Sequence, residues 1–227
     1  MVVEVLEKII KRIIKPVFIY SIIKPTKPIS DWHGFDRGTP VDRFYIENFL
    51  EKNKSKITGN CLEFLNNDYT IKFGSNVIKS DVIDIDPKNT KATIISDVKN
   101  MINIEDNHYD CIIMTQVLNF IDEVELAIKE THRILKPGGV VLITTPFINR
   151  MDKYSGPDLD YWRFSKKGLE HLLLKQFQSE NTTVESCGNI YGGIMNFIGA
   201  TIEDSSKNKL EKHDENFPVI VSAVAKK

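Results

Sequence analysis

The sequence predicts one α/β domain whose core is a doubly wound parallel sheet. Short apolar runs alternate with stretches of helical periodicity along most of the chain, which is the pattern of strands and helices that follow one another. Residues 109–147 show a complete strand–helix–strand unit. The 227 residues are enough for one such domain with a full core and one or two extra helices.

The unit over residues 109–147 supports this prediction in detail. Residues 112–114 form a short apolar run, as expected for a strand buried on both faces. Asp122 and Glu125 are spaced as in a capping box, and apolar residues then recur at helical spacing. The Lys-Pro-Gly-Gly run at 136–139 is expected to end that helix, because Pro cannot continue it and Gly tolerates a left-handed turn. Residues 140–144 read as a second buried strand, so both strands open onto the sheet edge where such folds bind ligands.

Further elements are predicted on both sides of this unit. The Pro-Lys-Asn-Thr-Lys run at 87–91 is too short for a crossover helix, so one face of the sheet is expected to be thinly covered. The other predicted elements are a helix over 41–52, strands over 61–64, 77–85 and 92–96, a helix capped by Ser165, a strand over 184–187, a helix over 192–202 and a strand over 219–225.

The composition narrows the class of protein. Hydrophobic residues make up 41% and charged residues 27%, as in an ordinary soluble domain. The 30 basic and 31 acidic residues give a net charge of −1, so no basic surplus suggests binding to nucleic acid. The three cysteines are scattered and odd in number, which favours buried free thiols in a reducing compartment, the cytoplasm. No Cys or His spacing typical of a metal site is present.

The first 25 residues predict an amphipathic helix with an apolar stripe and a basic polar face formed by Lys8, Lys11, Arg12 and Lys15. The segment also carries acidic residues and has no long uncharged core, so we interpret it as neither a signal peptide nor a membrane span. Two interpretations stay open. The helix packs on its own domain or on a partner subunit, or it lies on a membrane surface near a lipid-linked substrate.

Acidic residues mark the ends of the first three predicted strands: Glu63 and Asp84 lie at the ends of the first two, and Asp97 directly follows the third. A carboxylate after the second strand is suited to ribose hydroxyls, and one after the third can accept a hydrogen bond from the adenine amine. Neither position suits a phosphate, which a carboxylate repels. Because no GxGxxG or P-loop motif is present, an adenosine-containing ligand without phosphates fits better than NAD or ATP.

Two long motifs resemble those of Rossmann-like (class I) S-adenosylmethionine-dependent methyltransferases of the broad type 11 group. They are YDCIIMTQVLNFIDE and HRILKPGGVVLITTP, followed by DYWRFSKKGL. The segments DRGTPVDRFYIENFL, CLEFLNNDYTIKFG and ATIISDV resemble a bacterial subgroup often found beside glycosyltransferases. The resemblance covers nearly the whole chain and implies a seven-stranded sheet with an antiparallel last strand. We accordingly divide the chain into an N-terminal helix and lid segment, 1–40, and a methyltransferase domain, 41–227.

The resemblance implies S-adenosylmethionine as the cofactor and assigns it residues by position. For each acidic residue the alternative is a solvated carboxylate at a strand end, and Asp81 and Asp86 lie close to the expected ribose ligand. The assigned residues are Glu63 at the methionine end, Asp84 at the ribose, Asp97 and the Val98 backbone at the adenine, and Thr115 and Gln116 near the reactive sulfonium.

The loop after the first strand departs from the family pattern. Most of these enzymes have a glycine-rich loop there, whereas residues 64–69 read Phe-Leu-Asn-Asn-Asp-Tyr. Asn and Asp tolerate left-handed conformations and make their own turns. We interpret the glycine-poor loop as a variation that bears on cofactor affinity.

Methyl transfer is an in-line displacement that alignment and desolvation promote, and a hydroxyl or amine acceptor can call for a general base. We expect residues 36–40 and 160–164 to form the lid and the acceptor site. The candidate bases are His33, Asp36, Asp160 and Tyr161. The candidate substrate residues are Arg37 and Arg163, which hold an anion or serve as ion-pair partners, and Tyr45, Tyr161 and Trp162, which stack on a sugar or adenine or pack in the core.

The leading hypothesis is an O-methyltransferase that acts on a sugar of a surface glycan or its nucleotide-linked precursor. The alternatives are a methyltransferase for a small metabolite or lipid-like acceptor, and a non-catalytic cofactor-binding partner that docks to a glycosyltransferase through the N-terminal helix.

Overall fold

The computed structural model describes residues 26–152 and 159–227. The helix predicted over 1–25, with its contact to a membrane or a partner, lies outside the described residues. No helix in the described ranges is both long and apolar enough to cross a membrane. The chain divides into two compact units, which are described separately: a first unit whose described residues are 26–45, 148–150 and 187–219, and a second unit of residues 46–147, 151–186 and 220–227 without the undescribed 153–158.

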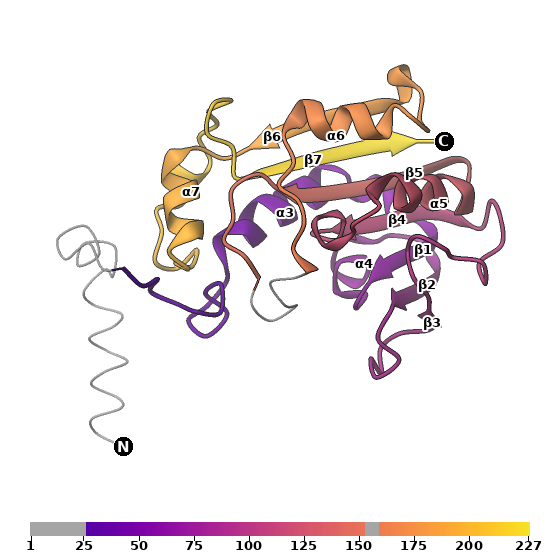
Figure 1. Cartoon of the computed structure of the whole chain (residues 1–227), viewed down its shortest axis with the longest axis horizontal. Helices are drawn as coiled ribbons and strands as arrows, with labels where there is room; N and C mark the ends of the chain where they lie inside the picture. The colour runs from indigo at the N-terminus through magenta and orange to yellow at the C-terminus, as the bar shows by residue number, and fades with distance from the viewer. Residues whose placement is uncertain (1–25, 153–158) are drawn as a thin grey trace. The chain divides into compact units, whose positions relative to one another are not determined.

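Strands and helices alternate along the described chain (Figure 1). The helices are α3 (Val41–Lys52), α4 (Asp68–Phe73), α5 (Val124–Ile134), α6 (Lys166–Leu173), α7 (Ile190–Phe197) and α8 (Lys207–Leu210), with 3-10 turns η1 (Lys54–Lys56), η2 (Leu118–Phe120) and η4 (Ser179–Asn181). The strands are β1 (Gly59–Phe64), β2 (Val77–Asp84), β3 (Ile94–Ile95), β4 (Tyr109–Thr115), β5 (Leu135–Pro146), β6 (Thr182–Cys187) and β7 (Ile220–Lys226).

The strands form one seven-stranded sheet in the order β3-β2-β1-β4-β5-β7-β6. The pairs from β3 to β5 are parallel, and β7 runs antiparallel to β5. In the middle of the sheet, Ile112 of β4 is opposite Leu62 of β1 and Val141 of β5. This arrangement confirms the predicted doubly wound, mostly parallel sheet with its antiparallel last strand.

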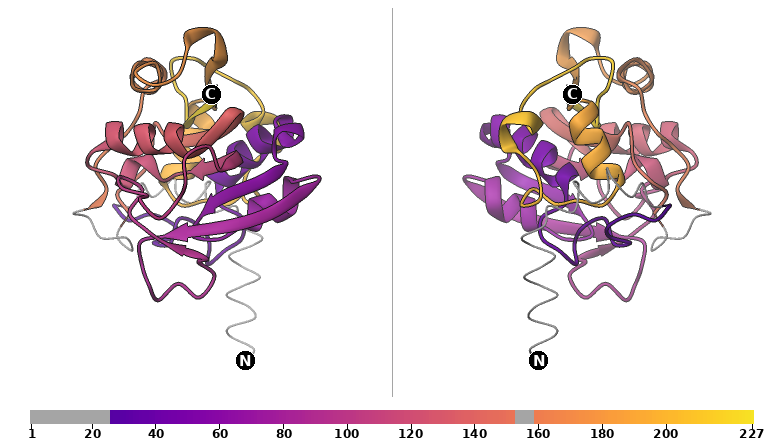
Figure 2. Two further views of the ribbon diagram at one scale, coloured as in Figure 1. Left: turned by 90° about the vertical axis from the view of Figure 1, so that its right-hand side faces the viewer. Right: turned by 90° about the vertical axis from the view of Figure 1, so that its left-hand side faces the viewer.

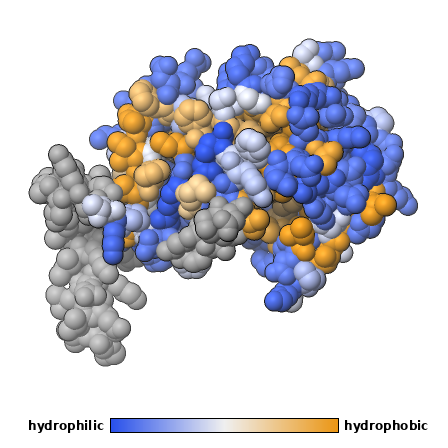
Figure 3. Space-filling view, viewed as in Figure 1, coloured by the Kyte–Doolittle hydropathy of each residue, from blue (hydrophilic) through white to orange (hydrophobic). Residues whose placement is uncertain are grey.

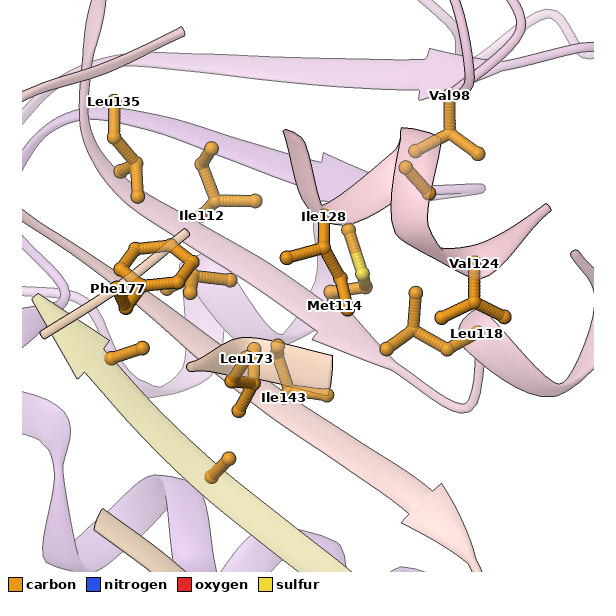
Figure 4. Close-up of a cluster of buried hydrophobic side chains, with 14 of the residues drawn as sticks. Val98, Ile112, Met114, Leu118, Val124, Ile128, Leu135, Ile143, Leu173 and Phe177 are labelled. Atoms are coloured by element: carbon orange, nitrogen blue, oxygen red, sulfur yellow. The ribbon is translucent and has the colours of Figure 1, made fainter. Parts of the chain in front are cut away.

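Helices lie on both sides of the sheet (Figure 2), and α5 and α6 cover one face with a continuous apolar core (Figure 4). Val124 and Ile128 of α5 and Leu173 of α6 are buried there with Ile112 and Ile143 of the sheet. The described residues between β2 and β3 contain no helix, as the short 87–91 run predicts.

The predicted start of α5 is wrong. The N-cap residue is Glu123, and its side chain makes no capping hydrogen bond. The Asp122 carboxylate accepts hydrogen bonds from the Glu123 N–H at 2.9 Å and from Lys99 Nζ at 2.8 Å. The Asp122 side chain therefore pairs with Lys99, a lysine from a distant loop, and does not cap the helix.

The predicted end of α5 is also wrong. The helix ends at Ile134 and β5 begins at Leu135, so the Lys-Pro-Gly-Gly run lies within the strand. Leu135 is already paired with Tyr109 of β4, with a register shift before the next pair. Gly138, at φ +83°, donates its N–H to the Lys227 carbonyl. Strand pairing thus ends the helix before the glycines are reached. The Ser165 cap is confirmed, with Oγ accepting from the Gly168 N–H at 3.1 Å.

In the first unit, the segment 29–40 packs along residues 198–204. The Ile29 N–H donates to the Ile198 carbonyl at 2.8 Å, and Pro40 forms a bridge with Thr201. Arg37 forms an ion pair with Asp204 at 3.1 Å. These contacts fix the segment within its own unit.

Helix α7 is shorter than the predicted 192–202. Asn189 caps it by accepting a hydrogen bond from the Gly192 N–H at 3.0 Å, and Gly199, at φ +73°, follows its end. One face exposes about half of Ile190, Ile194 and Phe197, and apolar side chains gather over α7 in Figure 3. The opposite face buries the two glycines at 192 and 193.

We predict that Gly192→Ala destabilises the protein, because its new Cβ would lie 2.2 Å from the Tyr45 hydroxyl oxygen. The clash should outweigh the better helix propensity of Ala and lower the free energy of unfolding by about 1–3 kcal/mol in chemical denaturation. Gly193→Ala is the matched control, because its Cβ would meet only Ile148 at an ordinary 3.5 Å.

The cause is tested by adding Tyr45→Phe to Gly192→Ala. Within the described part of the chain the buried Tyr45 hydroxyl has no hydrogen-bond partner, so its removal should cost little and restore most of the lost stability. A double variant as unstable as Gly192→Ala alone would show that the clash with the hydroxyl is not the cause.

Candidate functional site

The candidate site is the edge of the second unit where the parallel strands end. At the end of β1, Glu63 is 2% exposed, and its carboxylate is used by the loop that follows. It accepts hydrogen bonds from the Tyr69 N–H at 3.1 Å, the Thr70 N–H at 2.7 Å and Thr70 Oγ1 at 2.8 Å. Burial raises the pKa of Glu63, although these hydrogen bonds oppose the rise. The carboxylate therefore holds the first turn of α4 against β1.

The same loop contains no glycine, and Leu65 adopts the left-handed conformation, at φ +68°. The residue is 59% exposed. Its backbone is held on both sides, because the N–H donates to the Ile83 carbonyl at 3.0 Å and the carbonyl accepts from Asn89 Nδ2 at 2.7 Å. Strand pairing and a side-chain amide thus impose a turn that a glycine would adopt without strain.

Asp84 ends β2 and is 9% exposed. Its carboxylate accepts hydrogen bonds from the Asp86 N–H at 3.0 Å and from Asn89 Nδ2 at 2.6 Å, so Asn89 links the ends of β1 and β2. Asp81 has a different environment. It is buried within β2 and accepts hydrogen bonds from Tyr109 Oη at 3.0 Å and Thr93 Oγ1 at 3.1 Å. Of the two, only Asp84 lies at the carboxyl end of the strand.

Asp97 follows β3 in a tight turn, where its carboxylate accepts from the Lys99 N–H at 2.9 Å. The Val98 side chain is buried in the core, which leaves its backbone as the part available to a ligand. Lys99 Nζ reaches Asp122 at 2.8 Å and thereby joins this turn to the segment after β4.

Thr115 ends β4 opposite Thr144 of β5. Gln116 then leaves the strand in a left-handed conformation, at φ +55°. The Gln116 N–H donates to the Thr144 carbonyl at 2.7 Å, which holds this strained turn against β5. Both side chains are partly exposed, as expected for residues that border a ligand site.

Residues 160–163 are joined to the segment after β4 through Asn119 of η2. The Asn119 carbonyl accepts hydrogen bonds from the Tyr161 N–H at 2.8 Å and the Trp162 N–H at 3.2 Å. Trp162 Nε1 also donates to the Ile121 carbonyl at 2.7 Å. Tyr161 and Trp162 remain 47% and 44% exposed. The structure thus holds these predicted residues against the segment that follows β4.

Asp160 and Arg163 form a fixed ion pair. The guanidinium donates to the two carboxylate oxygens at 2.6 and 2.8 Å, and the Asp152 N–H donates to the second oxygen at 3.0 Å. Burial alone would raise the pKa of Asp160, but these hydrogen bonds and the Asn119 side chain together lower it. Asp160 is therefore ionised at neutral pH and is a weaker base than an ordinary carboxylate.

The other predicted residues belong to the first unit. His33 is partly exposed and left-handed at φ +53°, and Asp36 accepts a hydrogen bond from Ser30 Oγ. Arg37 is paired with Asp204. Tyr45 is 5% exposed and lies edge-on to Phe44, and burial raises the pKa of its hydroxyl. The expected lid residues 36–40 and acceptor residues 160–164 thus belong to different units.

Two site residues were missed by the sequence analysis, Asn89 and Asn119. Asn89 lies in the run that seemed only a short connection, and its side chain links two strand ends. Asn119 is a single polar residue in the apolar stretch Val-Leu-Asn-Phe-Ile, and it is 4% exposed. A buried amide in an apolar run was the one signal available in the sequence.

The hydrogen-bond acceptors at this edge fit an adenosine-containing cofactor. Carboxylates stand at the end of β2 and after β3, where hydroxyl and amine donors can be bound, and the buried Asn119 side-chain oxygen has no partner among the described residues. Across residues 26–152 and 159–227, no group of three His, Cys, Asp or Glu side chains is arranged to hold a metal ion.

Comparisons with known proteins agree with this fold. Residues 58–143 match the family model described as "Methyltransferase domain". No curated protein matches the sequence. A S-adenosylmethionine-dependent methyltransferase from Archaeoglobus fulgidus is similar in structure, with 14% identity, a TM-score of 0.52, and coverage of 82% of this chain and 94% of that one.

Two further solved structures are similar at the level of the fold. One is the N-methyltransferase NodS from Bradyrhizobium japonicum in complex with S-adenosyl-L-homocysteine, with 14% identity, a TM-score of 0.53, and coverage of 87% and 93%. The other is the [4+2]-cyclase SpnF, with 14% identity, a TM-score of 0.51, and coverage of 92% and 90%. The fold is therefore that of Rossmann-like methyltransferases. The matched domain and these neighbours together support a methyltransferase that uses S-adenosylmethionine.

We predict that Leu65→Gly stabilises the protein by up to about 1 kcal/mol in chemical denaturation. The glycine removes the cost of a left-handed side-chain-bearing residue, which exceeds the added chain entropy. Asn66→Gly is the matched control in the same loop, and it should destabilise because Asn66 Oδ1 accepts from the Asp68 N–H at 3.0 Å. Equal losses of stability in both variants would contradict a strained turn at Leu65.

Proposed function

We propose that this methyltransferase O-methylates a sugar hydroxyl of a surface glycan or its nucleotide-linked precursor. The observation that carries the proposal is the position of Tyr161 and Trp162. Their backbones are bonded to Asn119 beside the end of β4, and nearly half of each side chain is exposed. Exposed aromatic rings next to a reaction site are suited to stack on the apolar face of a sugar ring.

In this proposal the cofactor lies along the strand ends in the order of the sheet. Asp97 and the Val98 backbone bind the adenine after β3, and Asp84 accepts hydrogen bonds from the ribose hydroxyls at the end of β2. Glu63 acts at the methionine end by holding the loop after β1, since its carboxylate already accepts three hydrogen bonds. Thr115 and Gln116 border the reactive sulfonium at the end of β4.

The chain's own residues contribute position and desolvation. When bound, the cofactor would supply the methyl group: the bond from the acceptor oxygen to the methyl carbon would form as the carbon–sulfur bond breaks toward sulfur, and the hydroxyl proton would pass to water or to a general base. Asp160 holds Arg163 and the Asn119 side chain, and its lowered pKa makes it a positioning carboxylate. His33 and Asp36 in the first unit and Tyr161 in the second stay predictions for a general base, as do Arg37 and Tyr45 for substrate contact.

A glycosyltransferase partner, a membrane contact and a cytoplasmic location likewise stay predictions. The first two depend on residues 1–25, which lie outside the described chain.

The acceptor class is tested with methyl-labelled S-adenosylmethionine and three panels: nucleotide-activated sugars, lipid-like alcohols and small amines. We expect product mass spectra to show a methyl ether on a sugar. Trp162→Ala should raise the KM for the sugar about tenfold, the loss of one aromatic stacking contact, with little change in the affinity for S-adenosylhomocysteine.

Trp162→Phe is the matched variant, because it keeps an aromatic face and loses only the Nε1 hydrogen bond to Ile121. Its KM should stay near that of the unchanged protein. Transfer to amines or lipid-like alcohols with none to sugars would overturn the proposed acceptor while leaving the methyltransferase itself intact.

A further inference from the structure

The side-chain oxygen of Asn119 is a buried acceptor without a donor. The residue is 4% exposed, and in the described part of the chain no group donates a hydrogen bond to Oδ1. Buried polar atoms in folded proteins are nearly always bonded. A buried acceptor left unpaired destabilises the folded state, so its presence at a ligand-binding edge points to a donor that the ligand supplies.

The orientation of this side chain is fixed by its neighbours. Its backbone carbonyl is held by the Tyr161 and Trp162 N–H groups. The Asn119 side chain lowers the pKa of Asp160, and the ionised carboxylate can only accept hydrogen bonds. The amide NH₂ group must therefore face Asp160, which Arg163 holds in place at 2.6 and 2.8 Å. Oδ1 is left as the unsatisfied end of a rigid amide.

The sheet order places Asn119 at one end of the proposed cofactor site. Asp97 and Asp84 follow β3 and β2, whereas Asn119 follows β4, the strand on the far side of β1. A cofactor with its adenine after β3 and its ribose at β2 extends its sulfonium toward β4. Asn119 then lies three residues beyond Gln116, on the side where the methyl group leaves.

We propose that Asn119 Oδ1 accepts a hydrogen bond from the group that receives the methyl. It orients the acceptor's O–H or N–H so that a lone pair on the same atom faces the methyl carbon. An amide oxygen is not basic enough to take the proton, so Asn119 selects and aligns acceptors that carry a donor. This inference rests on the proposed placement of the cofactor.

The test compares two probes by calorimetry, S-adenosylhomocysteine and sinefungin. Sinefungin has a carbon in place of the sulfur of S-adenosylmethionine, and this carbon carries an amine in place of the transferred methyl group, so it presents N–H donors at the transfer position. We expect the unchanged protein to bind sinefungin about tenfold more tightly than S-adenosylhomocysteine, as one hydrogen bond to a charged donor allows. Asn119→Ala should abolish this preference and leave the S-adenosylhomocysteine affinity within about twofold.

Asn119→Leu is a second variant that keeps the side-chain volume in its apolar surroundings and should give the same result. Asn60→Ala is the matched control, because Asn60 lies near the amino end of β1 with Nδ2 3.5 Å from the His108 carbonyl. It should keep the preference for sinefungin.

The outcomes separate this inference from the proposed function. No preference in the unchanged protein would overturn the role of Asn119 and indicate that a buried water satisfies Oδ1. A preference that survives both Asn119 variants, or an equal loss of both probes in folded variants, would also overturn it. Failure of the unchanged protein to bind either probe would instead overturn the placement of the cofactor.

Discussion

Loops that leave a parallel sheet at its carboxyl edge have no strand partner of their own, and in this protein side chains hold them. Glu63 binds the first turn of α4 to β1, and Asn89 joins the ends of β1 and β2. The Lys99 side chain and the Asn119 backbone carbonyl tie the turns after β3 and β4 to neighbouring segments. These bonds tie the loops at the edge to the strand ends and to one another.

These bonds explain how the loop after β1 adopts its turn without a glycine. Leu65 adopts the left-handed turn because its N–H and its carbonyl are both engaged, by Ile83 and by Asn89. Gln116 does the same at the end of β4, held by Thr144. Strain at both turns is offset by bonds to neighbouring strands, and backbone strain of this kind is typical of ligand-binding sites.

Much of the fold could be predicted from local patterns. The apolar runs and helical periodicity located β4, α5 and the later strands, and the Ser165 cap lies where the sequence placed it. The errors came from interactions between distant residues. Asp122 pairs with Lys99 in place of capping α5, and Leu135 pairs with Tyr109 before the glycines are reached.

In the candidate site, too, features set by local sequence were predictable and features set by contacts between distant residues were not. Acidic residues at strand ends were predictable because topology alone brings them to one edge. Asn89 and Asn119 were not, because their importance depends on which loops the fold brings together. Arg37 illustrates the opposite case: a charge that suggested an anion site forms an ion pair with Asp204 of the same unit.

The central claim is that the adenosine part of the cofactor lies against the strand ends of β2 and β3. Calorimetric titration with S-adenosylhomocysteine tests it most directly in Asp97→Ala, with Asp106→Ala as the control, since Asp106 pairs with Arg133 before β4 at the opposite edge of the sheet. We expect binding to be weakened by roughly 1–3 kcal/mol in Asp97→Ala, the cost of removing one partner of a polar contact, and to be unchanged in Asp106→Ala. Equal affinity in the two variants would contradict it.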